Sequence, residues 1–133
     1  MPRAVARRRE GYTHDVEIDG HELIVDEPAA GGGADQGPSP TRLLAVALAS
    51  CTAITIEMYA DRKGWDLGQL EVTVDMEYGE RSAPRSFQVT VKLPGELSDE
   101  QRRRLEAIAA RCPVHRVLAH EAEVQVEDRF DSG

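Results

Sequence analysis

Hydrophobic and polar residues alternate in four segments of the chain, a period of two that is typical of half-buried β-strands. The first segment, 16–25, alternates on both sides of Asp19-Gly20, a dipeptide that favours a tight turn between antiparallel strands. The other three segments are 70–78, 87–93 and 121–127. We therefore expect a hairpin near the start of the chain, two further antiparallel strands, and a closing strand.

A spacing of three and four residues replaces the alternation between Thr41 and Lys63 and predicts a helix. Pro40 precedes this helix and Gly64 follows it, as is usual at helix starts and ends. Its apolar stripe is Leu44, Leu48, Cys51, Thr55 and Met58. Because residues 43–56 are apolar on nearly every side, we expect the helix to be covered by sheet and by a second subunit.

A second helix is predicted from a capping box, in which Ser98 is the N-cap and Gln101 follows three residues later. Its apolar face is Leu105, Ile108, Ala109 and Cys112. Pro113 cannot continue this helix but suits the first position of a new one. We therefore expect a break at Cys112 and a short helix from Pro113 to Leu118.

Two segments lack such patterns. Residues 28–40 hold four glycines and three prolines and predict a Gly/Pro-rich loop of a length that usually has a function. Residues 1–10 carry an arginine cluster and are interpreted as a basic N-terminal tail. The 133 residues suit one domain, 1–133.

The net charge of -8 argues against a nucleic-acid partner, because an acidic surface repels phosphate backbones. No apolar stretch follows the N-terminal arginines, so no secretory signal is expected. The only long uncharged run, 43–56, is shorter than the roughly twenty residues that span a bilayer. We therefore expect a cytoplasmic protein with no membrane partner. In that compartment two cysteines are either buried and inert or engaged in transient chemistry.

The two thiols differ in their predicted surroundings. Cys112, as the N-cap of a helix that begins at Pro113, would meet free backbone N–H groups that lower its pKa. Cys51 lies within the apolar helix, where burial raises a thiol pKa unless a cation is close. Either cysteine also fits plain core packing, since free cysteines are among the most buried residues.

His115, three residues after Cys112, fits either a metal ligand or a base, or simply a polar residue of the short helix. A single C-x-x-H with one distant cysteine offers too few ligands for a closed zinc site. The other histidines, His14, His21 and His120, show no paired spacing.

Two segments carry a family likeness. "GPSPTRLLAVALASCTAITIEMYADRKGW" and "RCPVHRVL" resemble the two cysteine motifs of the OsmC/Ohr family, the osmotically inducible and organic-hydroperoxide-resistance proteins, and in particular its OsmC-like branch. The likeness extends from about Tyr12 to Val126. It implies an α+β fold, in which a central buried helix packs against antiparallel sheets of an intertwined homodimer, with the cysteine pair near the subunit boundary.

The resemblance also implies a chemistry. In active relatives the first cysteine, matching Cys51, attacks a hydroperoxide as a thiolate and becomes a sulfenic acid. The second, matching Cys112, condenses with it to a disulfide, which an external dithiol reduces. No metal, flavin or other cofactor is implied. The residues Leu44, Leu48, Ile54 and Met58 would supply an apolar wall for an organic hydroperoxide.

This chain departs from the family at the groups that activate the thiolate. An arginine from the N-terminal region, oriented by a glutamate early in the central helix, holds the thiolate in relatives. Here the glutamate positions are Thr41 and Arg42. Arg42 lies nine helical residues from Cys51, about 13.5 Å, too far to reach it within one chain. The candidate arginines are Arg3, Arg7, Arg8 and Arg9.

Two functions follow from these observations. The first is a thiol-dependent peroxidase that reduces organic hydroperoxides through Cys51 and Cys112. The alternative is a catalytically weak or inactive OsmC-like dimer that binds a small apolar ligand or senses oxidant, which the absent carboxylate favours.

Overall fold

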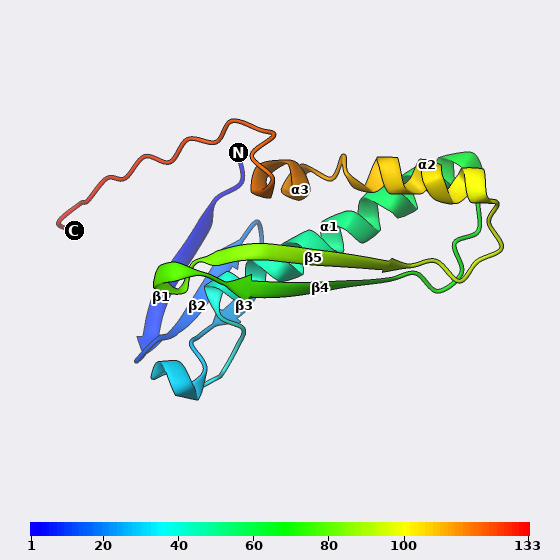
Figure 1. Cartoon of the computed structure of the whole chain (residues 1–133). Helices are drawn as coiled ribbons and strands as arrows, with labels where there is room; N and C mark the ends of the chain where they lie inside the picture. The colour runs from blue at the N-terminus through cyan, green and yellow to red at the C-terminus, as the bar shows by residue number, and fades with distance from the viewer. The chain divides into compact units, whose positions relative to one another are not determined.

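The computed structural model describes all residues from Met1 to Gly133 and shows a mixed α+β fold with two antiparallel sheets (Figure 1). Contacts divide the chain into two compact units. Unit 1 comprises Met1–Val46 and Asp75–Gln88, and unit 2 comprises Ala47–Val74 and Val89–Gly133. The α+β class predicted from the sequence is confirmed.

Unit 1 contains a three-stranded sheet in the order β1-β2-β3, formed by β1 (Ala4–Glu10), β2 (Thr13–Ile18) and β3 (His21–Val25). The predicted hairpin is confirmed, because Asp19 and Gly20 take φ values of 46° and 81° between β2 and β3, as a two-residue turn requires. The interpretation of residues 1–10 as a tail is wrong, because β1 pairs along β2 from Ala4 to Glu10.

The long helix α1 runs from Pro40 to Lys63, so it begins one residue before the predicted start at Thr41 and ends where predicted. Gly64 follows it with a φ of +71°, the left-handed conformation common after a helix. Its buried stripe is Leu48, Thr52, Ile56 and Ala60. The predicted stripe is therefore wrong at its ends, since Leu44 and Met58 are exposed. Within one chain only 22% of the most apolar part of α1 is buried, and its cover by a second subunit stays a prediction.

Two strands and two helices complete the chain: β4 (Glu71–Tyr78), β5 (Pro84–Lys92), α2 (Asp99–Ala109) and α3 (Pro113–Leu118). β4 and β5 pair as a hairpin across the short turn η2 (Glu80–Ser82). The predicted capping box of α2 is confirmed, because Ser98 and Gln101 exchange side-chain and backbone hydrogen bonds.

The core of unit 2 lies where α1 meets α2 and β5. Ile56 and Ala60 of α1 and Leu105 of α2 are buried there together with Leu67. Figure 1 shows α2 beside the second half of α1. Half-buried side chains that complete this cluster are Tyr59, Trp65, Leu70, Val91, Leu93, Leu97 and Ala109. This core holds α2 against the second half of α1 within unit 2.

The prediction of a closing strand at 121–127 is wrong for a single chain. Residues after α3 have no regular secondary structure, and Figure 1 draws them as an extended run from orange to red. Val124, Val126 and Phe130 are exposed along this segment. Alternation predicts a strand only where a partner strand is available, and this segment pairs with none in the chain.

Candidate functional site

The two cysteines, sixty-one positions apart in the sequence, meet in unit 2. Cys51 lies in the middle of α1, and Cys112 lies between α2 and α3. A hydrogen bond joins their side chains and is one cause of the raised pKa of Cys112. Both thiols are free, without a disulfide. The packing of α2 against α1 through Leu105 and Ile56 therefore brings the C-terminal end of α2 to the level of Cys51.

Cys112 is the N-cap of α3, as predicted, and its Sγ accepts a hydrogen bond from the backbone N–H of His115 at 3.4 Å. Its predicted pKa shift is nevertheless wrong in sign. Burial is the largest effect and raises the pKa, the Cys51 side chain raises it further, and the N–H groups of His115 and Val114 oppose the rise without cancelling it. Cys112 therefore stays a protonated thiol near neutral pH.

Exposure distinguishes the two sulfur-bearing residues. Cys112 is completely buried, whereas Cys51 is partly accessible. A protonated Cys112 is a hydrogen-bond donor, and Cys51 is the neighbour that can accept. A reagent from solvent therefore meets Cys51 first, while Cys112 is held next to it.

His115 is close to Cys112 in the sequence, but its side chain makes no hydrogen bond to either cysteine. Its Nδ1 atom is buried and has no hydrogen-bond partner. The backbone N–H of His115 lowers the pKa of Cys112. No arginine or lysine side chain contributes to the shift of that pKa. No group of three or more histidine, cysteine or acidic side chains gathers with the spacing of a metal site.

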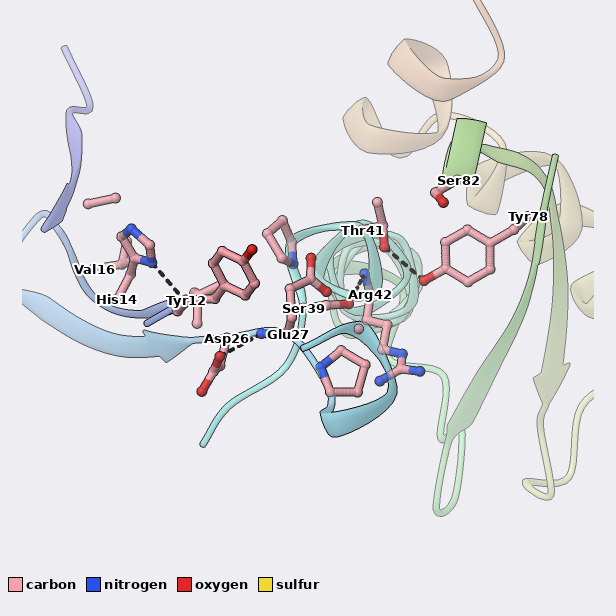
Figure 2. A pocket seen from close by; sticks show the side chains of 15 residues that line it. Tyr12, His14, Val16, Asp26, Glu27, Ser39, Thr41, Arg42, Tyr78 and Ser82 are labelled. Carbon is pink, nitrogen blue, oxygen red and sulfur yellow. Dashed lines mark hydrogen bonds between the residues drawn. The ribbon is translucent and has the colours of Figure 1, made fainter. Parts of the chain in front are cut away.

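Unit 1 contains a separate pocket of about 830 Å³ (Figure 2). This volume falls in the range of small-molecule sites. Its walls come from the β1–β3 sheet, the 28–40 loop, the start of α1 and the β4–β5 turn. The lining side chains labelled in Figure 2 are Tyr12, His14, Val16, Asp26, Glu27, Ser39, Thr41, Arg42, Tyr78 and Ser82.

A buried carboxylate organises the 28–40 loop beside this pocket. Asp26 is 1% exposed and accepts a 2.7 Å hydrogen bond from the hydroxyl of Thr13, which holds the end of β3 to β2. It also accepts from the backbone N–H groups of Glu27, Ala34 and Gln36. These four donors, with the Thr13 hydroxyl first, hold the pKa of Asp26 below its usual value against the opposing effect of burial.

Thr41 and Arg42, where the resemblance implies an acidic residue in relatives, make hydrogen bonds at the start of α1. The hydroxyl of Thr41 lies 2.8 Å from that of Tyr78, and Figure 2 shows the two side chains facing each other. The backbone N–H of Arg42 is 3.4 Å from the Ser39 hydroxyl, while its guanidinium makes no ion pair within the chain. The hydroxyl pair of Thr41 and Tyr78 thus joins the start of α1 to β4.

The N-terminal arginines are engaged on the β1–β2 face of unit 1. Arg9 forms a short ion pair with Asp15, Arg7 pairs with Glu17 at 3.7 Å, and Arg8 donates to the carbonyl of Gly11 at 3.0 Å. These contacts account for three of the four candidate arginines as partners of their own hairpin.

Sequence reasoning missed two groups in the structure. In the sequence Asp26 looks like an ordinary turn residue after an apolar strand. No nearby residue indicates that Thr13 and the loop would supply it with four hydrogen-bond donors. Tyr59 and Arg104 are forty-five positions apart, and only the packing of α2 on α1 brings them within hydrogen-bond distance. The Gly/Pro-rich composition was the one signal for the first group.

Comparisons with known proteins agree with this fold. The family model of the OsmC-like proteins matches residues 32–127. Among curated proteins no sequence matches the chain. The OsmC-like protein of Mycoplasma pneumoniae has a similar structure, with a TM-score of 0.77 at 18% identity, over 90% of this chain and 87% of that one.

Two further solved structures carry functional names. The organic hydroperoxide resistance protein OsmC of Legionella pneumophila is 24% identical, with a TM-score of 0.62 over 89% of this chain and 88% of that one. The organic hydroperoxide resistance protein OhrB of Bacillus subtilis is 22% identical, with a TM-score of 0.61 over 88% and 89%. Because the family model covers well over half of the sequence, and both cysteine motifs lie inside it, the chain belongs to the OsmC-like protein family.

Proposed function

We propose that this protein is a thiol-dependent peroxidase that reduces organic hydroperoxides, with Cys51 as the nucleophile and Cys112 as the resolving thiol. The observation that carries the proposal is the hydrogen-bonded contact of the two side chains, in which Cys51 is partly accessible and Cys112 is buried, with its pKa raised by that burial. Two named structural relatives are organic hydroperoxide resistance proteins, which supports the same substrate class.

The proposed reaction has three steps. The Cys51 thiolate attacks the terminal oxygen of the hydroperoxide, the O–O bond breaks, Cys51 becomes a sulfenic acid, and the departing alkoxide takes a proton to form an alcohol. The Cys112 thiol then condenses with the sulfenic acid, which forms the disulfide and releases water. An external dithiol supplies two electrons by exchange and restores both thiols.

We further propose that the working form is a homodimer in the cytoplasm. Only 22% of the most apolar part of α1 is buried within one chain, and by length and composition this helix would also be apolar enough to cross a membrane. A second copy that covers α1 accounts for its exposed apolar side chains. Two free thiols that must return to the reduced state suit a reducing compartment.

The test of the peroxidase is the loss of free thiols after cumene hydroperoxide is added to reduced protein. We expect rapid loss of two thiols per chain and an intramolecular Cys51–Cys112 disulfide in the wild type. Cys51→Ser abolishes the fast phase. In Cys112→Ser, Cys51 still oxidises but stops at sulfenic or higher acids, which mass spectrometry distinguishes. Thiols that survive excess hydroperoxide would contradict the proposal.

A second function, binding of a small apolar ligand without turnover, is favoured by the 830 Å³ pocket in unit 1 and by the missing carboxylate at Thr41 and Arg42. Under this reading the same thiol assay shows unreactive cysteines. Ligand binding would then change the thermal stability of the Cys51→Ser variant as much as that of the wild type.

A further inference from the structure

Three cations gather around one tyrosine in unit 2 without an acidic partner. The Nε atom of Arg104 on α2 donates to the hydroxyl of Tyr59 on α1 at 2.9 Å. The Nζ atom of Lys63 lies 5.6 Å from the centre of the same ring, and the guanidinium carbon of Arg104 lies 5.6 Å from it as well. The charge of Arg111 also reaches the Tyr59 hydroxyl. We call Tyr59, Lys63, Arg104 and Arg111 the Tyr59 cluster.

The arrangement is unusual for this chain because acidic residues outnumber basic ones, twenty-four against sixteen. Each of the four ion pairs in the structure involves other arginines. Arg104 instead donates to a neutral hydroxyl, and Lys63, Arg104 and Arg111 are all exposed. The hydrogen bond from Arg104 and the three positive charges lower the pKa of Tyr59. Like charges held together without a counter-ion attract an external anion.

We infer that the Tyr59 cluster is the docking site for an acidic protein segment that carries the dithiol reductant of the Cys51–Cys112 disulfide. The second half of this inference rests on the proposed function. Two electrons must come from outside for each turnover, and Arg111 directly precedes Cys112 in the sequence. Tyr59 lies eight helical residues from Cys51, about 12 Å along α1.

That distance favours a macromolecular partner over a small dithiol. One side of a protein interface covers about 800 Å², which spans roughly 30 Å and so includes both the cluster and the thiols. A small dithiol cannot contact both at once. An acidic protein segment is favoured over nucleic acid, because the chain has a net charge of -8 and the cluster holds only three cations.

The cluster contains its own reporter. Trp65, the single tryptophan of the chain, packs edge-on against Tyr59 with ring centres 5.6 Å apart and an interplanar angle of 67°. The binding probe is a peptide with a Ser-x-x-Ser centre flanked by glutamates. Its matched partner carries glutamine at each glutamate position.

In the binding experiment, Trp65 fluorescence is titrated with each peptide at low and at physiological salt. We expect the acidic peptide to bind at least about tenfold more tightly than the glutamine peptide, with weaker binding at higher salt. The triple variant Lys63→Gln, Arg104→Gln, Arg111→Gln loses this preference, whereas the control Arg85→Gln in unit 1 keeps it. Circular dichroism checks that each variant is folded. Equal binding of both peptides, or an unaffected triple variant, overturns the inference, as does tighter binding of a single-stranded oligonucleotide.

The exchange experiment uses the acidic peptide with a Cys-x-x-Cys centre against the preformed protein disulfide. A peptide thiolate attacks the disulfide, a mixed disulfide forms, and the second peptide thiol closes the peptide disulfide and frees both protein thiols. We expect the triple variant to slow this reaction about tenfold and to leave reduction by uncharged dithiothreitol within about twofold of wild type. Equal slowing with both reductants overturns the docking role. If hydroperoxide forms no disulfide, the proposed function fails, and the binding experiment still decides the Tyr59 cluster.

Discussion

At the residue scale, Asp26 shows how one buried carboxylate holds a loop that has little regular structure of its own. It joins the Thr13 hydroxyl to three backbone N–H groups between Glu27 and Gln36. A buried carboxylate is stable only when its oxygens are satisfied by donors, and here the loop supplies them. The shape of the pocket wall in unit 1 therefore depends on the ionised form of Asp26.

Asp26→Asn tests this dependence through pH. Because the folded pKa of Asp26 is lowered, its ionised form contributes stability that is complete above the unfolded carboxyl pKa of about 3.9 and is lost as pH falls through the lowered value. We expect the variant to unfold several degrees below wild type at neutral pH, with the gap narrowing in acid. Thermal unfolding followed by circular dichroism across a pH series measures the gap.

The matched control is Asp35→Asn in the same loop. Asp35 is exposed and has a φ of +54°, a conformation that asparagine also tolerates. The Asp35→Asn variant should have an unfolding temperature close to that of the wild type at every pH. A constant difference between Asp26→Asn and wild type from neutral to acid pH would show that the charge of Asp26 is not what holds the loop.

At the element scale, α2 depends on its first turn. Ser98 accepts from the N–H of Gln101 at 3.0 Å, and the Gln101 side chain accepts from the N–H of Ser98 at 2.8 Å. Asp99 and Glu100 add negative charge at the same end. This helix supplies Leu105 to the core and ends three residues before Cys112, so its start influences the position of Cys112.

Ser98→Ala removes the side-chain cap and should lower the free energy of unfolding by about 1 kcal/mol, because one N–H group of the first turn loses its partner. Ser98→Asp keeps an acceptor and should remain near wild type. Denaturant unfolding measures both values. Equal stability of the alanine and aspartate variants would show that the cap contributes nothing to α2.

The helices and most strands were predictable because their signals are local. Each of these signals determines the structure of only a few neighbouring residues. They are the capping box at Ser98, the proline at position 113 and the Asp19-Gly20 turn. The burial of α1 was harder, because the face that Leu48 and Ile56 share is selected by α2 and the β-strands that pack on it. Alternation at 121–127 failed for the same reason, since a strand requires a neighbour.

Some residues of the candidate site could be predicted from local motifs, and others could not. Cys51 and Cys112 were identified from two motifs, and their contact follows from the packing of α1 and α2. The pKa of Cys112 was predicted in the wrong direction, because the sequence indicates the N-cap position but not the complete burial that outweighs it. Asp26 and the Tyr59 cluster depend on residues distant in sequence and carry no local signal.

At the scale of the whole molecule, the exposed apolar side chains of α1 define the proposed dimer. Ile54 is 51% exposed and Met58 is 61% exposed, although both belong to the most apolar helix of the chain. Single exposed apolar residues are ordinary, but a row of them on one helix indicates a missing partner. A second copy of the chain would cover them.

Ile54→Lys should convert the protein from dimer to monomer, because a charge would be buried where the second copy packs. The side chain is exposed within one chain, so the variant should keep the far-ultraviolet circular dichroism of wild type. Light scattering measures the mass. Ile54→Val, which keeps an apolar side chain at the same position, is the control and should stay dimeric. A wild-type protein with the mass of one chain, or a dimeric Ile54→Lys, would contradict the proposal.

The contrast between a sealed Cys112 and an accessible Cys51 also decides where lasting damage falls. Sulfinic and sulfonic acids form only when a second oxidant molecule reaches a sulfur that has already reacted. Cys112 is shielded from that encounter, so under the proposed function irreversible lesions would accumulate on α1 alone. The number of turnovers before a molecule is lost would then be set by competition between fresh oxidant and Cys112 for the oxidised Cys51, and the hydrogen bond between the two side chains favours Cys112.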